Sequence, residues 1–472
     1  MVAPPQSAPP SDNDLVPSGV LLRWSTPADG VHLASLCEAV FCENEPRFVG
    51  SKRAQVARLM HGDHPMMAPG DVAIAVDERL RERGENPVVS CVCLVTQDVM
   101  YDGVEFKLGR PENVATRREY RRRGLVRRLM DIVHARCEAE GILVLAIAGI
   151  HHFYRQFGYE YALSLGGQRT TLISMLPPLK PNTLEPYTLR SATATDTPLI
   201  RQLIEDSESK HMVRTLISTS TWLYYLQQPP SKPKNLWDIH VVIDTATLKP
   251  CGALAIWSPR WYDAIDVKFI ELLRNVPLQI ALPSIARQIL QLSTPQTAVP
   301  PDPLTQIIWS LGPTHRVYDV LNRPGTYPLA AVATPPYAWY VRIPSLARFL
   351  MHVAPALERR LAASDCHRNY TGELRVHFYA APGFRLEFGA GRVVRADEFR
   401  VNYTDAKSPV EAANVADARF PPMVFWKCVL GYRSVEEVLH MYPDAGIMRV
   451  EAIGLLETLF PKRESCLRGL YM

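Results

Sequence analysis

The sequence predicts an α/β (α+β) protein made of two copies of one fold followed by a third α+β unit. Three observations support this prediction. A Leu-Arg-x-x-Thr-x-x-Asp pattern begins at Leu22 and returns at Leu189. A succession of strand, glycine turn, helix and strand runs from residue 114 to 159. After Thr334-Pro335-Pro336 the composition changes, and strand and helix patterns start again. A domain-sized repeat suggests that one structural unit has been duplicated.

The composition indicates a globular protein of two to three domains, because 472 residues are too many for one hydrophobic core. A net charge of +4 does not imply a nucleic-acid or membrane partner. No apolar run approaches the roughly 18 to 20 residues that span a bilayer. Nine cysteines without framework spacing predict free thiols in a reducing cytosol, and so a cytoplasmic location.

The first domain is expected over residues 20–176. Before it, residues 1–19 are rich in Pro, Ser and Asp and lack an apolar signal core, which predicts a disordered tail. Leu22-Arg23 reads as a strand end, and Asp29 is suited to cap the apolar helical stripe that follows.

The second copy is expected over residues 187–336, after a proline-rich linker at residues 177–186. It repeats the pattern from Leu189 to Leu203 and contains strand patterns such as Trp237–Asp244. It has no Arg-x-x-Gly segment before its expected helix. We therefore expect a structural copy that does not hold a pyrophosphate.

The third unit is expected over residues 337–472. Trp339–Arg342 and Gly372–Tyr379 have strand patterns, while Val435–Met441 and Ala452–Phe460 have amphipathic helical patterns.

The segment from residue 114 to 159 carries the strongest functional signal. Val114-Ala115-Thr116 reads as a strand end, and Arg121–Val126 opens a helix whose expected C-terminal cap is Gly141. A helix N-terminus offers several backbone N–H groups and a favourable dipole to a phosphate group. Gly124 lets the backbone approach the phosphates closely. The alternative is a nucleic-acid-binding face, since seven arginines lie between Arg117 and Arg128.

The two motifs in this segment resemble the fingerprint of the GNAT superfamily of N-acetyltransferases. The fingerprint is Arg/Gln-x-x-Gly-x-Gly/Ala followed by Tyr-x-x-x-Gly-Phe/Tyr. The residues that match are Arg121, Gly124 and Val126 for the first motif, and Tyr154, Gly158 and Tyr159 for the second. The three-unit order resembles the Eis-like (enhanced intracellular survival) acetyltransferases, whose last domain is like a sterol carrier protein. Two short phrases near the end, Gly431–Ser434 and Leu459–Lys462, also resemble that family.

The resemblance implies acetyl-CoA as the acyl donor and assigns residues to it. The main chain of Val114, Ala115 and Thr116 would bind the pantetheine arm and polarise the thioester. The residues that would surround the pyrophosphate are Arg121, Arg122, Arg123, Gly124, Leu125, Val126 and Arg127. Tyr154, with an ordinary pKa near 10, would be the general acid. The C-terminal carboxylate of Met472 would be the base.

The roles of several other polar residues remain open. The acceptor side could be lined by Glu38, Glu43 and Glu45, although surface charge explains them equally well. Family members that act on aminoglycosides carry a Glu next to the terminus, where this chain has Tyr471. His151-His152 precedes Tyr154 without a defined role. His61 and His64 lack a third ligand, so no metal is expected.

The expected function is therefore acetyl transfer from acetyl-CoA to a primary amine, on a small molecule or a lysine side chain. The alternative is a non-catalytic lipid- or partner-binding protein built on the same scaffold. No nucleic-acid or membrane partner is expected, and the resemblance suggests a homo-oligomer.

Overall fold

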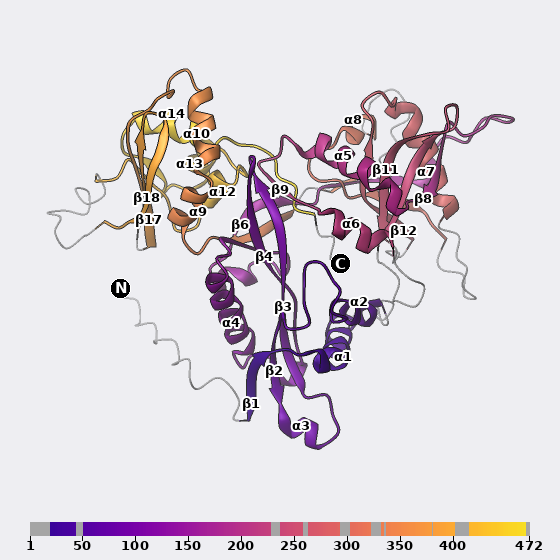
Figure 1. The fold of residues 1–472 in the computed structure, drawn as a ribbon, viewed down its shortest axis with the longest axis horizontal. Coiled ribbons are helices and arrows are strands. Elements are labelled where there is room, and N and C mark those ends of the chain that lie inside the picture. Colours follow the sequence, from indigo (N-terminus) through magenta and orange to yellow (C-terminus); the bar gives the residue numbers. More distant parts are fainter. Residues whose placement is uncertain are drawn as a thin grey trace, which may run out of the picture. The chain divides into compact units, whose positions relative to one another are not determined.

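The computed structural model describes residues 19–43, 51–227, 237–257, 263–292, 303–321, 332–334, 337–379, 381–401 and 415–468 (Figure 1). Nearly all of the expected N-terminal tail and the last four residues lie outside these ranges. The chain forms two compact units: the first contains the residues up to Thr96 together with Gly109–Ile142, and the second contains Gln97–Leu108 and the chain from Leu143 onward.

The described residues form the following strands and helices. The strands are β1 (Val20–Trp24), β2 (Val72–Asp77), β3 (Val88–Tyr101), β4 (Val104–Thr116), β5 (Val144–Ile147), β6 (Glu160–Leu165), β7 (Gln168–Leu172), β8 (Tyr187–Ser191), β9 (Val213–Thr215), β10 (Trp237–Asp244), β11 (Lys249–Trp257), β12 (Ala264–Leu272), β13 (Gln306–Trp309), β14 (Val332–Thr334), β15 (Tyr337–Arg342), β16 (Gly372–Phe378), β17 (Ala381–Gly389), β18 (Arg392–Phe399), β19 (Ala418–Arg419) and β20 (Gly446–Ile447). The helices are α1 (Gly30–Phe41), α2 (Ser51–Leu59), α3 (Glu78–Glu82), α4 (Leu125–Ala139), α5 (Thr197–Glu208), α6 (Thr219–Leu226), α7 (Leu278–Leu292), α8 (Arg316–Leu321), α9 (Leu346–His352), α10 (Ala354–Ala363), α12 (Trp426–Val429), α13 (Val435–Met441) and α14 (Glu451–Leu459).

The first unit is an antiparallel sheet with helices on both faces. β2 pairs with β1 on one side and with β3 on the other. Apolar residues of α1 and α2 pack on one face, in a core that includes Ile74 and Cys91. The buried stripe of α4, which includes Leu125, Leu129 and Val133, lies outside that core, and α4 contacts β2. Gly141 ends α4 as predicted, because its φ of +73° allows a Schellman turn in which Ile142 N–H donates to Cys137 O.

The repeated sequence pattern forms the same turn twice. In the first copy, the Arg23 guanidinium binds both Asp29 carboxylate oxygens at 2.8 Å, and Thr26 donates its N–H to Asp29 at 2.8 Å. In the second copy, Arg190 binds Asp196 at 2.7 Å through both nitrogens, and Thr193 N–H donates at 2.8 Å. Each aspartate precedes the first residue of α1 or α5. The sequence repeat therefore reflects a repeated strand–turn–helix unit.

The two large sheets share one strand order. The first sheet runs β1-β2-β3-β4-β5-β15-β6, with β9 added on β3, and the second runs β8-β10-β11-β12-β13-β7-β14. The sixth place is taken by β15 in the first sheet and by β7 in the second. The strand predicted at Trp339–Arg342 is therefore present, but it pairs with β5 and β6 rather than with the strands of the third sheet.

Helices cover both faces of the second sheet. α7 and α8 share a core with Leu254 and Ile270, which are partners in the β11–β12 register. α5 contacts β11 and β12. Since successive residues of a strand point to opposite faces, Glu271 faces away from the α7 side. This placement puts Glu271 beside Ser207 of α5, whose hydroxyl donates to it at 2.9 Å.

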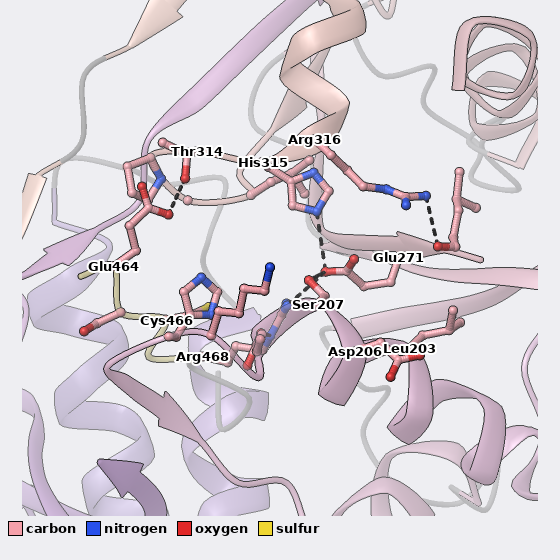
Figure 2. A pocket seen from close by; sticks show the side chains of 18 of the residues that line it. Leu203, Asp206, Ser207, Glu271, Thr314, His315, Arg316, Glu464, Cys466 and Arg468 are labelled. Atoms are coloured by element: carbon pink, nitrogen blue, oxygen red, sulfur yellow. Dashed lines mark hydrogen bonds and ion pairs between the residues drawn. The ribbon is translucent and has the colours of Figure 1, made fainter. Parts of the chain in front are cut away.

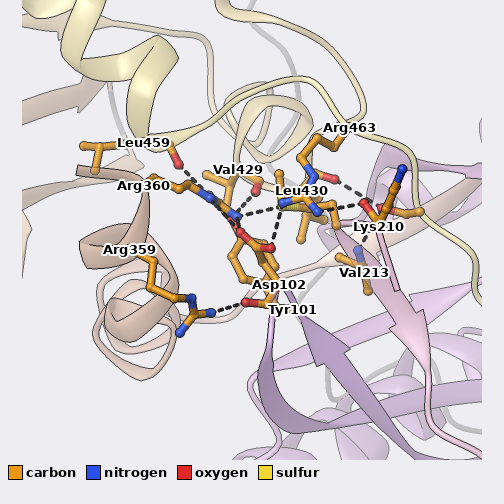
Figure 3. Close-up of polar contacts among 12 residues, drawn as sticks. Tyr101, Asp102, Lys210, Val213, Arg359, Arg360, Val429, Leu430, Leu459 and Arg463 are labelled. Carbon is orange, nitrogen blue, oxygen red and sulfur yellow. Dashed lines mark hydrogen bonds and ion pairs between the residues drawn. The ribbon is translucent and has the colours of Figure 1, made fainter. Parts of the chain in front are cut away.

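The third sheet has the order β18-β17-β16-β19-β20, with α9 and α10 against β17 and β18 (Figure 1). A polar cluster joins this part of the chain to the β3–β4 turn, where Asp102 has a φ of +45°. Arg360 donates to Asp102 Oδ2 at 2.7 and 2.9 Å, and Arg463 donates to Asp102 Oδ1 at 2.7 Å (Figure 3). Tyr101 beside it donates its hydroxyl to Val429 O at 2.7 Å.

All nine cysteines lie in described ranges, and none of them forms a disulfide, as predicted. Among the described helices, none combines the length and apolarity needed to cross a membrane.

Candidate active site

The loop between β4 and α4 has an unusual backbone conformation. Arg122 and Gly124 are both left-handed, with φ of +61° and +71°, and α4 begins at Leu125. Such turns aim successive N–H groups at one point. The first N–H groups of the helix have no acceptor within the helix and carry its positive dipole end. The residues expected at the pyrophosphate, from Arg121 to Arg127, therefore gather at one helix N-terminus.

The arginine side chains of this loop make different contacts. Arg121 Nε donates to Thr116 O at 3.2 Å, and its Nη2 lies 3.1 Å from Glu43 Oε2. Arg121 therefore ties the loop to the end of β4. Arg122 and Arg123 are exposed, and the Arg123 guanidinium lies 5.1 Å from the centre of the Tyr120 ring. The side chains of Arg122 and Arg123 could reach phosphate oxygens from solvent.

The end of β4 is bent at Asn113, whose φ of +48° is unusual for a residue with a side chain. Asn113 O accepts from Cys91 Sγ at 3.3 Å, and Ala115 O accepts from Ser90 Oγ at 3.0 Å, so both carbonyls face β3. Because main-chain groups alternate in direction along a strand, those of Val114 face away from β3. This is the orientation that main-chain binding of an extended ligand requires.

Tyr154 lies in a short 3-10 turn, Phe153–Phe157, bounded by left-handed residues His152 and Gly158. Its side chain is 5% exposed and touches the rings of Phe153, Phe157 and Tyr340, with centroids 5.1, 6.2 and 5.6 Å away. A Cβ on Gly149 would lie 2.8 Å from Tyr154 Cε2. The tyrosine can occupy this position only because residue 149 is glycine.

Comparison with known proteins agrees with these features. Residues 23–162 match the model of an acetyltransferase (GNAT) domain. This part of the chain belongs to the GNAT acetyltransferases. The protein therefore contains a GNAT acetyltransferase domain, and the GNAT resemblance of the sequence is confirmed over these residues. No curated protein matches the chain by sequence.

Solved structures share the fold of this GNAT protein over nearly its whole length. A probable N-acyltransferase from Enterococcus faecalis V583 is 16% identical, with a TM-score of 0.63 over 95% of this chain and 99% of that one. A GCN5-related N-acetyltransferase from Anabaena variabilis is 12% identical, with a TM-score of 0.59 over 94% and 99%. Eis1 from Mycobacterium abscessus is 13% identical, with a TM-score of 0.51 over 94% and 98%. The architecture is thus Eis-like.

A cluster of three tyrosine hydroxyls supports the loop that leads to Tyr154 in the GNAT fold. Tyr161 Oη lies 2.6 Å from Tyr340 Oη and 2.9 Å from Tyr337 Oη. Tyr337 donates to Gly149 O at 3.0 Å, and Tyr340 donates to Ile150 O at 3.4 Å. Burial, and then the neighbouring Tyr161 hydroxyl, raise the pKa of Tyr337 and Tyr340 well above the ordinary value. Both hydroxyls therefore remain protonated donors.

The tyrosine cluster was not found from the sequence, because its members come from β6 and from β15, which are about 180 residues apart. A buried ion pair at the same place was missed for the same reason. Lys427 Nζ donates to Glu160 Oε1 at 3.0 Å and to Tyr161 O at 2.5 Å. Burial lowers the pKa of Lys427, and Glu160 opposes this. The pair fixes the start of β6 to α12.

The acidic residues considered for the acceptor side are paired where they are described. Glu38 Oε2 accepts from Arg53 Nε at 2.7 Å, and Glu43 lies 3.6 Å from Arg118 as well as contacting Arg121. These pairs reduce the negative charge that a cationic acceptor would meet. Glu45, Tyr471 and Met472 lie outside the described residues.

The histidine pairs do not form a metal site within the described ranges, where no group of three or more metal-binding side chains occurs. His61 Nδ1 lies 3.1 Å from Asp63 Oδ1. His64 is buried, and burial lowers its pKa to about 4. The His151 ring lies 4.8 Å from that of Tyr337, so this residue packs beside the tyrosine cluster.

Proposed function

We propose that the protein transfers an acetyl group from acetyl-CoA to a primary amine, on a small molecule or a lysine side chain. The observation that carries this proposal is the left-handed turn at Arg122 and Gly124 at the start of α4, directly after β4. It supplies the donor array that a pyrophosphate needs.

The acyl donor would bind along the end of β4. Main-chain groups of Val114 would hold the pantetheine arm as an added strand, and Arg122 and Arg123 would neutralise the phosphates. A backbone N–H near the thioester oxygen would stabilise the charge that develops there.

The reaction would then be direct. The neutral amine nitrogen attacks the thioester carbon, and a tetrahedral intermediate forms. The carbon–sulfur bond breaks as the carbonyl reforms, and the CoA sulfur takes the proton of the Tyr154 hydroxyl. The proton lost by the amine goes to the carboxylate of Met472. Each proton has a defined source and destination.

Two substitutions of glycine test the proposed acetyl-CoA site. Gly124 and Gly141 bound α4 at its two ends with nearly the same φ, +71° and +73°. Alanine at either position is strained by roughly 1 to 2 kcal/mol, and a Cβ at Gly141 would meet no atom within 4 Å. We expect Gly124→Ala to weaken acetyl-CoA binding at least tenfold by calorimetry, whereas Gly141→Ala leaves it within about twofold. Equal affinity for both variants, or no acetyl-CoA binding by the unaltered protein, would contradict the proposal.

A further inference from the structure

The chain segment before the C-terminus, residues 464–468, is held as an extra strand beside β9. Met212 N–H donates to Glu464 O at 2.6 Å, Cys466 N–H donates to Val213 O at 2.8 Å, and Thr215 N–H donates to Cys466 O at 3.1 Å. The bridge between Arg214 and Cys466 is parallel. Since β9 itself pairs with β3, the segment is tied to the first sheet.

Arg468 fixes the end of this segment with both its main chain and its side chain. Its N–H donates to Thr215 Oγ1 at 2.9 Å, and its carbonyl accepts from Gln97 Nε2 at 3.1 Å. Its guanidinium donates to Glu208 and lies 3.5 Å from Glu271 Oε1. Glu208 is 1% exposed and Glu271 is 4% exposed, so this arginine is clamped between two buried carboxylates.

The carboxylates belong to the second copy of the fold and line a cavity of about 510 Å³ (Figure 2). β12 and β13 are parallel neighbours as far as Val267 and Trp309; β12 then continues to Leu272 while β13 ends. The cavity lies between Glu271–Arg274 and Leu311–Arg316, where the two strands have separated. In strand order, β12 and β13 correspond to β4 and β5 of the first sheet. The cavity of the second copy therefore corresponds in position to the site that the acyl donor would occupy in the first copy.

The chemistry of this crevice suits an arginine rather than a coenzyme. In place of an Arg-x-x-Gly turn, residues 273–277 read Leu-Arg-Asn-Val-Pro. His315 and Ser207 both point to Glu271, at 3.5 and 2.9 Å, and so orient it toward Arg468 (Figure 2). Burial of an ion pair usually adds little to stability, so a buried arginine between two carboxylates indicates a requirement for position.

We infer that the crevice of the second copy is a clamp for the chain's own C-terminal segment, and that Arg468, held by Glu208 and Glu271, is a positioning residue for acetyl transfer. This inference rests on the proposed function, in which the carboxylate of Met472 accepts the amine proton. Four residues span at most roughly 14 Å, so fixing Arg468 restricts where that carboxylate can lie.

A double-mutant cycle tests the clamp. The four proteins are the unaltered chain, Arg468→Ala, the chain with one glycine added after Met472, and both changes together. Turnover is followed by thiol release from acetyl-CoA, with whichever of spermidine, tryptamine or Nα-acetyl-lysine is acetylated fastest. We expect each single change to lower kcat roughly tenfold or more, because a small misplacement of a catalytic group is costly. The KM and Kd for acetyl-CoA should stay within about twofold.

The combined protein distinguishes positioning from a general structural role. If Arg468 acts through the carboxylate of Met472, Arg468→Ala causes no further loss of kcat in the protein whose added glycine has already displaced that carboxylate. Arg468→Lys should recover part of the activity, because it restores charge without the two-pronged geometry. Arg463→Ala is the matched control: it removes an ion pair directly before this segment, five residues before Arg468, and should change kcat less than twofold.

The outcomes separate the two proposals. No acetylation of any of the three amines, or an unchanged kcat after the added glycine, contradicts the proposed function or its base. If the added glycine lowers kcat as expected, but Arg468→Ala has no effect or an effect that adds to that of the glycine, the clamp is contradicted and the proposed function is not.

Discussion

At the scale of single residues, glycine and tyrosine positions define the candidate site. Gly124 and Arg122 give the loop before α4 its left-handed backbone, and Gly149 leaves space for the Tyr154 ring. Tyr154 is 5% exposed and is buried among the rings of Phe153, Phe157 and Tyr340.

Replacing Tyr154 with phenylalanine should lower kcat by roughly 10² to 10⁴, the usual contribution of a general acid. The Kd for acetyl-CoA should stay within about twofold, because the ring is kept. Steady-state kinetics and calorimetry measure the two effects. Tyr101→Phe is the control, since it removes a buried hydroxyl that donates to Val429 O and should cost only about 1 kcal/mol of stability. Unchanged turnover in Tyr154→Phe would remove this residue from the acid role.

At the scale of elements, the Arg–Thr–Asp turn connects the first strand of each sheet to its first helix. In the second copy, the Arg190 hydrogen bonds lower the pKa of Asp196 to about 2, against the opposing effect of burial. In the first copy, burial opposes ionisation of Asp29, but the bonds from Arg23 and Thr26 outweigh it and lower its pKa to about 2. Both turns therefore depend on an ionised carboxylate.

This dependence predicts the effect of pH on Asp196→Asn. The lowered pKa of the folded state means that the carboxylate stabilises the fold above its ordinary pKa of 3.8, and that this contribution is lost as the pH falls toward 2. Urea unfolding should show a loss of about 1 to 3 kcal/mol near pH 6 that shrinks below pH 4. Asp365→Asn, at a side chain that is 98% exposed, should be nearly neutral throughout. A loss that is independent of pH would contradict the assigned ion pair.

At the scale of the whole molecule, each of the two large sheets contains a strand from another part of the chain. β15 completes the first sheet between β5 and β6, and β7 completes the second between β13 and β14. The hydroxyls of Tyr337 and Tyr340 that hold the loop before Tyr154 come from β15. The expected catalytic domain at residues 20–176 therefore does not include β15, which pairs with β5 and β6 in the first sheet.

A protein that ends at residue 176 should consequently fail to fold cooperatively. Without β15, β5 and β6 lose their shared partner and expose unpaired edges. We expect no sharp thermal transition by circular dichroism and no acetyl-CoA binding by calorimetry. A cooperative transition with the affinity of the full chain would show that β15 is dispensable.

The sequence by itself determined the repeated turn, the helix with its glycine ends and the glycine turn before α4, because these depend on neighbouring residues and on backbone conformations that glycine permits. Arg121 to Gly141 and the pattern at Arg23 and Arg190 are local in this sense. Only the tertiary structure decided which strand fills the sixth place of each sheet, that Tyr337 and Tyr340 support the loop before Tyr154, and that Arg468 is clamped by Glu208 and Glu271. Those contacts join residues that are more than 130 positions apart, and no local pattern of hydrophobicity or spacing encodes such a pairing.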